Sequence, residues 1–167
     1  MQYSTFLEKV FSLGRLVVAV SFLFALSGCG FFRADATDRG TGGADDVLET
    51  AFSQIGTRYK YGSASPKKGF DCSGFVYWVY KENGYTIPRM TSEQMKCGYA
   101  VSQKKARKGD IVVFKTSRSP SSLHSGIYVG KNAFIHSPSK GKTVKVDKMN
   151  NKYWKGKLVA VRRVIDE

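Results

Sequence analysis

The chain has 167 residues, of which 27 are Lys or Arg and 13 are Asp or Glu, so its net charge is +14 at pH 7. No internal repeat is visible, and the three cysteines form no CxxC pair, which argues against a zinc site. Such a positive charge favours an anionic partner, whose nature depends on the compartment in which the protein works.

The N-terminus has the pattern of a secretory signal. Residues 1–15 carry a positive charge from Lys9, Arg15 and the free amine against Glu8, and residues 16–26 are almost wholly apolar. That run is shorter than the about 20 residues that span a bilayer, and it has the length of a signal-peptide core. It ends in LSGC at residues 26–29, a small-residue pair before cysteine that is typical of a bacterial lipobox. We therefore expect residues 1–28 to be a lipoprotein signal peptide and Cys29 to carry the lipid. The alternatives are an ordinary signal peptide with a chance cysteine and an uncleaved anchor.

The residue after the lipidation site indicates the membrane. Gly30 stands where lipoproteins retained in the inner membrane carry an aspartate. The expected location is the cell envelope, with a lipid anchor at the periplasmic face of the outer membrane of a Gram-negative cell; a Gram-positive source is the alternative. Outside the cytoplasm, nucleic acid is not an expected partner, and the charge favours lipid head groups and the wall with its stem-peptide carboxylates. For any one lysine, including those of KKARK at 104–108, a solvated basic face is an equal explanation.

A tether separates this anchor from the folded part. Residues 29–44 contain several glycines and few bulky apolar side chains after Phe32, so we expect a lipidated cysteine followed by a flexible linker. Residues 45–167 remain, about 120 residues, which is enough for one domain with one core. We expect this domain to be a monomer.

Three helical segments are expected in the first half of the domain. The first, residues 46–56, has an apolar stripe at helical spacing and a capping box that opens at Asp46. The second, residues 72–83, follows Asp71 as its N-cap. A short third helix opens at a Thr-x-x-Gln box at residue 91 and ends near residue 98. The stripe of the first helix consists of Val47, Leu48, Ala51, Phe52 and Ile55.

After a turn at residues 108–110 the pattern changes to short runs rich in β-branched and aromatic residues, which predict strands. Short loops separate most of them, so we expect an antiparallel sheet of five or six strands with the helices packed beside it. That arrangement is an α+β domain. The expected strands are residues 111–114, 125–129, 133–136, 143–147 and 158–164.

Cys72 stands at the start of the second expected helix, and the only two histidines, His124 and His136, follow later. A thiol attacks as its thiolate, and a helix N-terminus or an imidazolium lowers the pKa of the thiol. These three residues are therefore candidates for a nucleophile, its base and a group that orients the base. The alternative is a buried, inert cysteine and two unrelated histidines. Cys97 is expected to be a free, buried thiol, because a disulfide to Cys72 would remove the nucleophile.

The loop between the strands of the two histidines decides whether the imidazoles share a face. Side chains alternate along a strand, so a two-residue loop places them on opposite faces. A three-residue loop over residues 130–132, or a bulge, places them on one face. In that register Gly126 would leave open space between the histidines. The opposite, core-facing side would be coherently apolar, which favours this register; it consists of Ile127, Val129, Ala133 and Ile135.

Several motifs, taken in order, resemble the NlpC family of bacterial cell-wall cysteine peptidases. They are DCSGFV at 71–76, HSGIYVG at 124–130 and FIH at 134–136, with further matches at 59–62, 87–92 and 108–114. The resemblance covers nearly all of residues 45–165, and the layout is closest to MepS-type murein endopeptidase lipoproteins. It implies a papain-like α+β fold, with N-terminal helices packed on a central antiparallel sheet.

The resemblance also implies an activity: cleavage of the murein stem peptide or cross-link at a D-glutamyl–diaminopimelate or D-alanyl–diaminopimelate bond, with no metal and no organic cofactor. Cys72 would be the nucleophile, His124 the base and His136 the third member that orients His124. Further residues expected to hold the oxyanion or the substrate are Tyr61, Asp71, Ser73 and Arg89. Asp71 has an equally good structural reason as a helix cap. The tether is too short for the SH3-like domain that restricts many relatives to trimmed peptides, so longer stems are also expected to fit.

Three other functions stay open at this point. The same fold is compatible with an acyltransferase or amidase that acts on a non-murein substrate. A non-catalytic, wall-binding lipoprotein is the second, and the complete set of Cys72, His124 and His136 argues against it. A toxin aimed at neighbouring cells is the third, and the lipobox argues against it.

Overall fold

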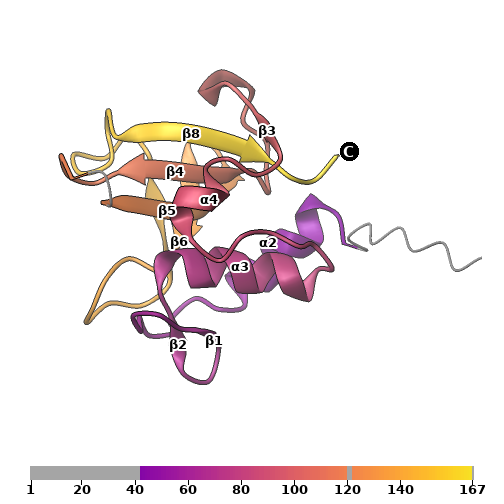
Figure 1. Ribbon diagram of the computed structural model, residues 1–167, viewed down its shortest axis with the longest axis vertical. Coiled ribbons are helices and arrows are strands. Elements are labelled where there is room, and N and C mark those ends of the chain that lie inside the picture. Colours follow the sequence, from indigo (N-terminus) through magenta and orange to yellow (C-terminus); the bar gives the residue numbers. More distant parts are fainter. Residues whose placement is uncertain (1–41, 120–121, 167) are drawn as a thin grey trace, which may run out of the picture. The chain divides into compact units, whose positions relative to one another are not determined.

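The computed structural model describes residues 42–119 and 122–166 (Figure 1). The predicted signal peptide, the predicted lipidation site at Cys29 and all but the last three residues of the predicted tether lie outside these residues. Within the described part of the chain, every helix falls short of the length and apolarity that a membrane span requires.

Helix α2 (Ala44–Phe52) begins and ends earlier than expected. Its N-cap is Gly43, whose backbone N–H donates to the Asp46 carboxylate at 2.8 Å. Asp46 therefore occupies the third helical position, and the prediction that it caps the helix is wrong. Because the helix ends at Phe52, Ile55 from the expected stripe lies beyond it and is 53% exposed.

Helix α3 (Cys72–Glu82) forms as expected behind Asp71, whose Oδ1 accepts the Gly74 N–H at 2.6 Å. Its apolar side is fully buried through Phe75, Val76, Val79 and Tyr80. Burial of one such side chain contributes about 1.5–3 kcal/mol. This packing fixes the helix on the sheet and thereby positions Cys72 in its first turn. The remaining helical segments are α4 (Thr91–Gln94) and the 3₁₀ turn η1 (Gln103–Lys105).

The main sheet of the described residues has six strands in the order β3-β8-β4-β5-β6-β7, and all neighbours are antiparallel. Each of the five expected segments contributes a strand, so the antiparallel sheet is confirmed. The edge strand β3 and the β1–β2 hairpin are not foreseen, because two residues are too few to show an alternation. The strands are β1 (Ala64–Ser65), β2 (Gly69–Phe70), β3 (Tyr99–Ala100), β4 (Ile111–Lys115), β5 (Leu123–Gly130), β6 (Ala133–His136), β7 (Lys145–Lys148) and β8 (Leu158–Arg163).

Both faces of the sheet are covered. Helices α2 and α3 lie against one face (Figure 1), where their buried side chains pack on alternate strand residues such as Ile111, Ile127 and Ile135. The opposite face carries a second, mostly aromatic cluster. It consists of Val112, Phe114, Phe134, Met149, Trp154 and Val161. Trp154 comes from the irregular segment between β7 and β8, so this segment closes the face that bears the histidines.

The β5–β6 hairpin has the register that places both histidines on one face. Ile127 pairs with Ile135 and Tyr128 with Phe134, and the register then shifts at a bulge before Gly130 pairs with Ala133. The turn residues Lys131 and Asn132 both have positive φ, at 48° and 56°. The bulge, and not a three-residue loop, therefore produces the shared face.

Gly126 does not leave open space between the histidines, and that expectation is wrong. A Cβ at this position would lie 2.7 Å from a ring carbon of Phe134 and 3.1 Å from Cβ of His136. The glycine is needed because the β6 side chains press against the β5 backbone.

Candidate active site

His124 on β5 and His136 on β6 form a buried pair. Nε2 of His124 and Nδ1 of His136 are 2.7 Å apart, and the residues are 6% and 0% exposed. The Trp154 ring packs against both imidazoles, with centroid separations of 5.1 and 5.4 Å. The indole thus excludes water from one side of the pair and limits how the rings can turn.

Asp147 on β7 extends this pair and is not foreseen by the sequence analysis. Its Oδ2 lies 3.1 Å from Nε2 of His136 and also accepts the indole N–H of Trp154 at 3.1 Å. Its Oδ1 lies 2.9 Å from Nζ of Lys145. The available signal is weak: Asp147 is the only acidic residue in the expected strand over residues 143–147.

The carboxylate fixes the proton positions along the chain of rings. An ionised carboxylate only accepts hydrogen bonds, so Nε2 of His136 carries its proton toward Asp147. In the neutral ring, Nδ1 of His136 is then an acceptor, and Nε2 of His124 must donate to it. Nδ1 of neutral His124 is consequently left with a free lone pair. The chain of contacts therefore leaves one particular ring nitrogen, Nδ1 of His124, able to accept a proton.

Burial keeps both rings neutral near pH 7. Desolvation, helped by the neighbouring His136, lowers the pKa of His124 to about 3, although Asp147 opposes this shift. Desolvation likewise lowers the pKa of His136 to about 4, against the opposite effect of Asp147 and with help from Lys145 and Lys142. The pKa of Asp147 is itself lowered, because its hydrogen bonds to Lys145, Trp154 and His136 outweigh its partial burial. Asp147 is therefore ionised, as the tautomer assignment requires.

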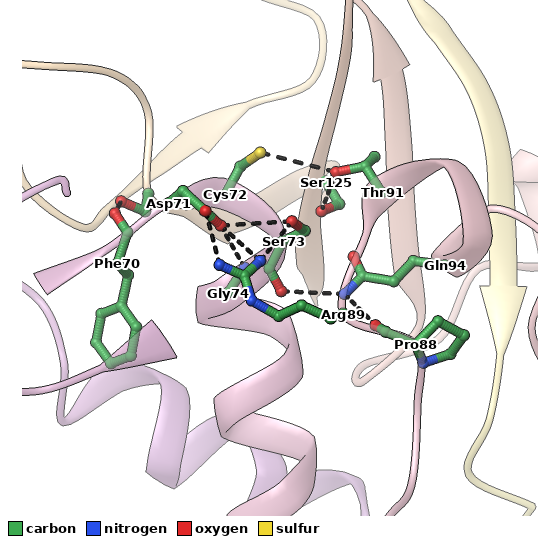
Figure 2. A network of polar contacts seen from close by, with 11 residues as sticks. Phe70, Asp71, Cys72, Ser73, Gly74, Pro88, Arg89, Thr91, Gln94 and Ser125 are labelled. Atoms are coloured by element: carbon green, nitrogen blue, oxygen red, sulfur yellow. Dashed lines mark hydrogen bonds and ion pairs between the residues drawn. The ribbon is translucent and has the colours of Figure 1, made fainter. Parts of the chain in front are cut away.

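Cys72 begins α3, and its thiol points toward α4 (Figure 2). Sγ lies 3.8 Å from Oγ1 of Thr91, which lies 3.3 Å from Oγ of Ser125, the residue after His124. Among the described residues, this contact with Thr91 is the only hydrogen bond of the sulfur, and none joins it to a histidine. The fold thus brings the thiol and the histidine strand to the same region through Thr91 and Ser125. Thr91 is a second site residue that the sequence analysis missed.

Three of the predicted substrate-binding residues form a clamp at the start of α3 (Figure 2). The two terminal nitrogens of Arg89 donate to the two carboxylate oxygens of Asp71 at 2.9 and 2.7 Å, and Nη1 also donates to Oγ of Ser73 at 2.9 Å. A Cβ on Gly74 would collide with the Ser63 carbonyl and with this guanidinium. The clamp holds the helix end that presents Cys72, so a structural role accounts for all three residues.

A cavity of about 640 Å³ opens over the thiol. Its lining includes Cys72, the clamp of Asp71, Ser73 and Arg89, and the phenols of Tyr59 and Tyr61. Tyr61 is 86% exposed and stands at the rim. Tyr59 is half-buried, and desolvation followed by the charges of Cys72 and Asp71 raises the pKa of its phenol. After Asp147 and Thr91, Tyr59 is therefore the third site residue that was not predicted from the sequence.

Other reactive groups of the described residues do not form a metal site. No group of three or more His, Cys, Asp or Glu side chains is arranged to hold a metal ion in residues 42–119 and 122–166. Cys97 is free, as expected, but only half-buried, and its Sγ donates to the Gln94 carbonyl at 3.1 Å. Burial raises the pKa of the Cys97 thiol, which favours the unreactive protonated form.

Comparisons with known proteins assign this arrangement to a family. Residues 56–163 match the NlpC/P60 family, and the chain belongs to that family. The resemblance stated from the sequence motifs and the α+β fold expected from it are thereby confirmed.

Two characterised relatives and one solved structure illustrate the match. The chain is similar to the murein DD-endopeptidase MepS/murein LD-carboxypeptidase of Escherichia coli (strain K12), with 42% identity over 111 residues, 66% of this chain and 57% of that protein. It is similar to the gamma-D-glutamyl-L-lysine dipeptidyl-peptidase of Bacillus subtilis (strain 168), with 36% identity over 127 residues, 75% of this chain and 43% of that protein. The chain thus spans about half the length of these relatives.

The solved structure is that of an NlpC/P60 family protein from Bacillus cereus ATCC 10987. It matches with a TM-score of 0.71 and 33% identity, over 75% of this chain and 41% of that protein.

Proposed function

We propose that the protein is a cysteine peptidase that hydrolyses a peptide bond in the murein stem peptide or cross-link. The observation that carries the proposal is the Asp147–His136–His124 chain, which leaves a neutral imidazole nitrogen available on the strand that Ser125 and Thr91 link to the Cys72 thiol at a helix N-terminus. The relatives support the substrate class, since one is named a murein DD-endopeptidase and the other a gamma-D-glutamyl-L-lysine dipeptidyl-peptidase. Because these names refer to different bonds, both D-glutamyl–diaminopimelate and D-alanyl–diaminopimelate bonds are candidates.

The first step is proton transfer from the Cys72 thiol to Nδ1 of His124. This step requires the sulfur to turn from Thr91 toward the imidazole by rotation about the Cα–Cβ bond of Cys72, the one rotatable bond of its side chain that moves the sulfur. The thiolate then adds to the peptide carbonyl carbon. The helix N-terminus and the imidazolium stabilise the sulfur anion before the attack.

The second step breaks the carbon–nitrogen bond. The oxyanion of the tetrahedral intermediate accepts from the backbone N–H of Cys72, and the phenols of Tyr61 and Tyr59, which line the same cavity, are the further hydroxyl donors we propose for it. Loss of one such donor typically costs about 3–4 kcal/mol in the transition state. His124 gives its proton to the leaving amine, and a water molecule then hydrolyses the thioester, which restores the thiol.

His136 and Asp147 are positioning residues in this scheme. His136 holds the ring of His124, and Asp147 holds the tautomer of both rings. Asp71, Ser73 and Arg89 hold the helix that carries Cys72, and they line the cavity in which the acyl half of the substrate binds. Met90 and Thr91 line the same cavity.

We further propose that the mature protein is a lipoprotein of the cell envelope. The lipobox that ends at Cys29 supports a lipid anchor at the periplasmic face of the outer membrane. The tether then ends before Gly43, because the N-cap of α2 at Gly43 already belongs to the folded part, which we propose to be a monomeric peptidase domain. Removal of residues 1–28 takes away Lys9, Arg15 and Glu8, which leaves 25 of the 27 basic and 12 of the 13 acidic residues and a net charge of +13 that supports attraction to the anionic wall.

Digestion of purified sacculi and of defined muropeptides by the full chain tests this function. New amine ends, located by mass spectrometry, identify the bond. Cys72→Ala is expected to lower turnover by at least about 10³-fold, the scale of losing a nucleophile, whereas Cys97→Ala is the matched thiol control and keeps activity. Equal turnover in Cys72→Ala contradicts the assignment. Acyl transfer without new amine ends in murein would instead indicate an acyltransferase, and wall binding without turnover a non-catalytic lipoprotein.

A further inference from the structure

A second cavity lies beside the histidine pair. Its volume is about 490 Å³, and its lining includes both histidines, Asp147 and the aromatic side chains of Tyr153 and Trp154. Leu123 lines this cavity and also the cavity over Cys72. The two cavities are therefore neighbours, with the thiol in one and His124 in the other.

The second cavity carries excess positive charge. Lys142 and Lys145 both line it. Lys145 is held by Asp147 at 2.9 Å, so these two charges offset each other. Lys142 makes no ion pair with any described residue, and its side chain is exposed. Since the buried histidines are neutral, Lys142 supplies the uncompensated charge among the residues that line the cavity.

The chemistry of the proposed reaction places one half of the substrate here. The carbonyl half becomes attached to Sγ of Cys72 and so occupies the first cavity. The amine half leaves with the proton of His124, so it must pass beside that ring. The cavity that His124 lines, across Leu123 from the thiol, is the space available to the amine half.

We propose that this cavity binds a free carboxylate on the amine side of the scissile bond, with Lys142 as the cation that receives it. The inference rests on the proposed peptidase function and adds a substrate requirement to it: the residue that supplies the leaving amine carries an unblocked carboxyl group. The half-exposed ring of Tyr153, over which Nζ of Lys157 lies at 3.6 Å, covers the aliphatic part of that residue. Ordinary peptides without such a carboxylate are poorer substrates.

The test uses the full chain and two synthetic peptides that are identical except that the amine-side residue ends in a carboxylate or in a carboxamide. We expect the wild type to prefer the carboxylate peptide by about tenfold in kcat/KM, the scale of one charge-assisted hydrogen bond at a partly exposed site. Lys142→Gln should abolish this preference by raising KM for the carboxylate peptide, with a much smaller change for the carboxamide peptide. Lys140→Gln is the matched control, because Lys140 is exposed on the same loop but does not line the cavity.

Two outcomes overturn the inference while the peptidase function stands: an undiminished preference in Lys142→Gln, or an equal loss on both peptides. A binding experiment separates failure of the inference from failure of the function. The Cys72→Ala full chain is titrated with the amine-side fragment, and the Trp154 indole signal is followed by NMR. Carboxylate-dependent shifts that vanish in Cys72→Ala/Lys142→Gln support the site even if no turnover is found. Shifts that do not depend on Lys142, or their absence, refute it.

Discussion

Replacement of Asp147 tests whether the tautomers of the histidine pair are set from β7. Asp147→Ala removes the carboxylate that accepts from Nε2 of His136 and from the Trp154 indole. Loss of a charge-assisted hydrogen bond costs about 1.5–3 kcal/mol. If that loss appears in the transition state, in which His124 becomes charged, kcat falls by about 10- to 150-fold.

Asp147→Asn is the informative companion. Its carbonyl oxygen is able to accept from both His136 and Trp154, so the tautomers are kept, but the pair with Lys145 is lost. We expect it to retain more activity than Asp147→Ala. In the other amide orientation the NH₂ group would donate to Nε2 of His136, reverse both tautomers and leave His124 with its proton on the wrong nitrogen.

The assay is steady-state hydrolysis of a defined muropeptide, accompanied by ¹⁵N NMR of the imidazole nitrogens. The NMR spectrum separates a positioning role from a purely structural one, because it reports which nitrogen of each ring is protonated. Unchanged kcat in a folded Asp147→Ala protein, or Nδ1-protonated His124 in the wild type, would refute the reasoning.

Four further predictions concern the same site. Because burial lowers the pKa of His124 to about 3 and the base acts unprotonated, kcat/KM should stay level as pH falls to about 5, and an acid limb near 6.5 would contradict this. The folded state also binds fewer protons than the unfolded state between the ordinary histidine pKa of about 6.5 and the lowered values, so Tm should fall as pH drops through that window. Arg89→Ala should lower the free energy of unfolding in urea by about 1–3 kcal/mol, because Asp71 loses its partner. Arg89→Lys should recover part of this free energy, since lysine keeps the positive charge but cannot make the bidentate contact with the carboxylate. Gly126→Ala should destabilise the folded protein by about 1–3 kcal/mol and lower kcat, because the added methyl group displaces His136. A variant with full activity and unchanged stability would show instead that the strand shifts to accommodate the methyl group.

The features that could be predicted from the sequence are those that depend on residues close together along the chain. The helix that carries Cys72 starts where Asp71 caps it, because an N-cap depends on a few adjacent residues. The shared face of the histidines followed from the alternation of side chains on two strands joined by a short turn. Even there, the sequence did not decide between a longer loop and a bulge, because Lys131 in a left-handed conformation has no distinctive signal.

Contacts that depend on distant register were not recovered. Asp147 meets His136 only because β7 pairs with β6 across the long connection over residues 137–144, whose length does not fix a register. Trp154 reaches the histidines from an irregular segment that has no periodicity to read. The role of Arg89 as a clamp likewise depends on how the segment before α4 folds back onto α3.

The three charges next to the histidine pair have separable effects, which gives a final prediction. Asp147 alone would raise the pKa of both imidazoles, whereas Lys145 and Lys142 oppose it at His136. Lys145→Gln should therefore raise the pKa of His136 and shift the acid limb of kcat upward, because Asp147 loses its closest cation. Lys142→Gln should chiefly raise KM for carboxylate substrates, since Lys142 makes no ion pair with the described residues. If both variants shift only the pH profile, or both raise only KM, then Lys145 and Lys142 do not have separate roles as the ion-pair partner of Asp147 and the cation that binds the substrate.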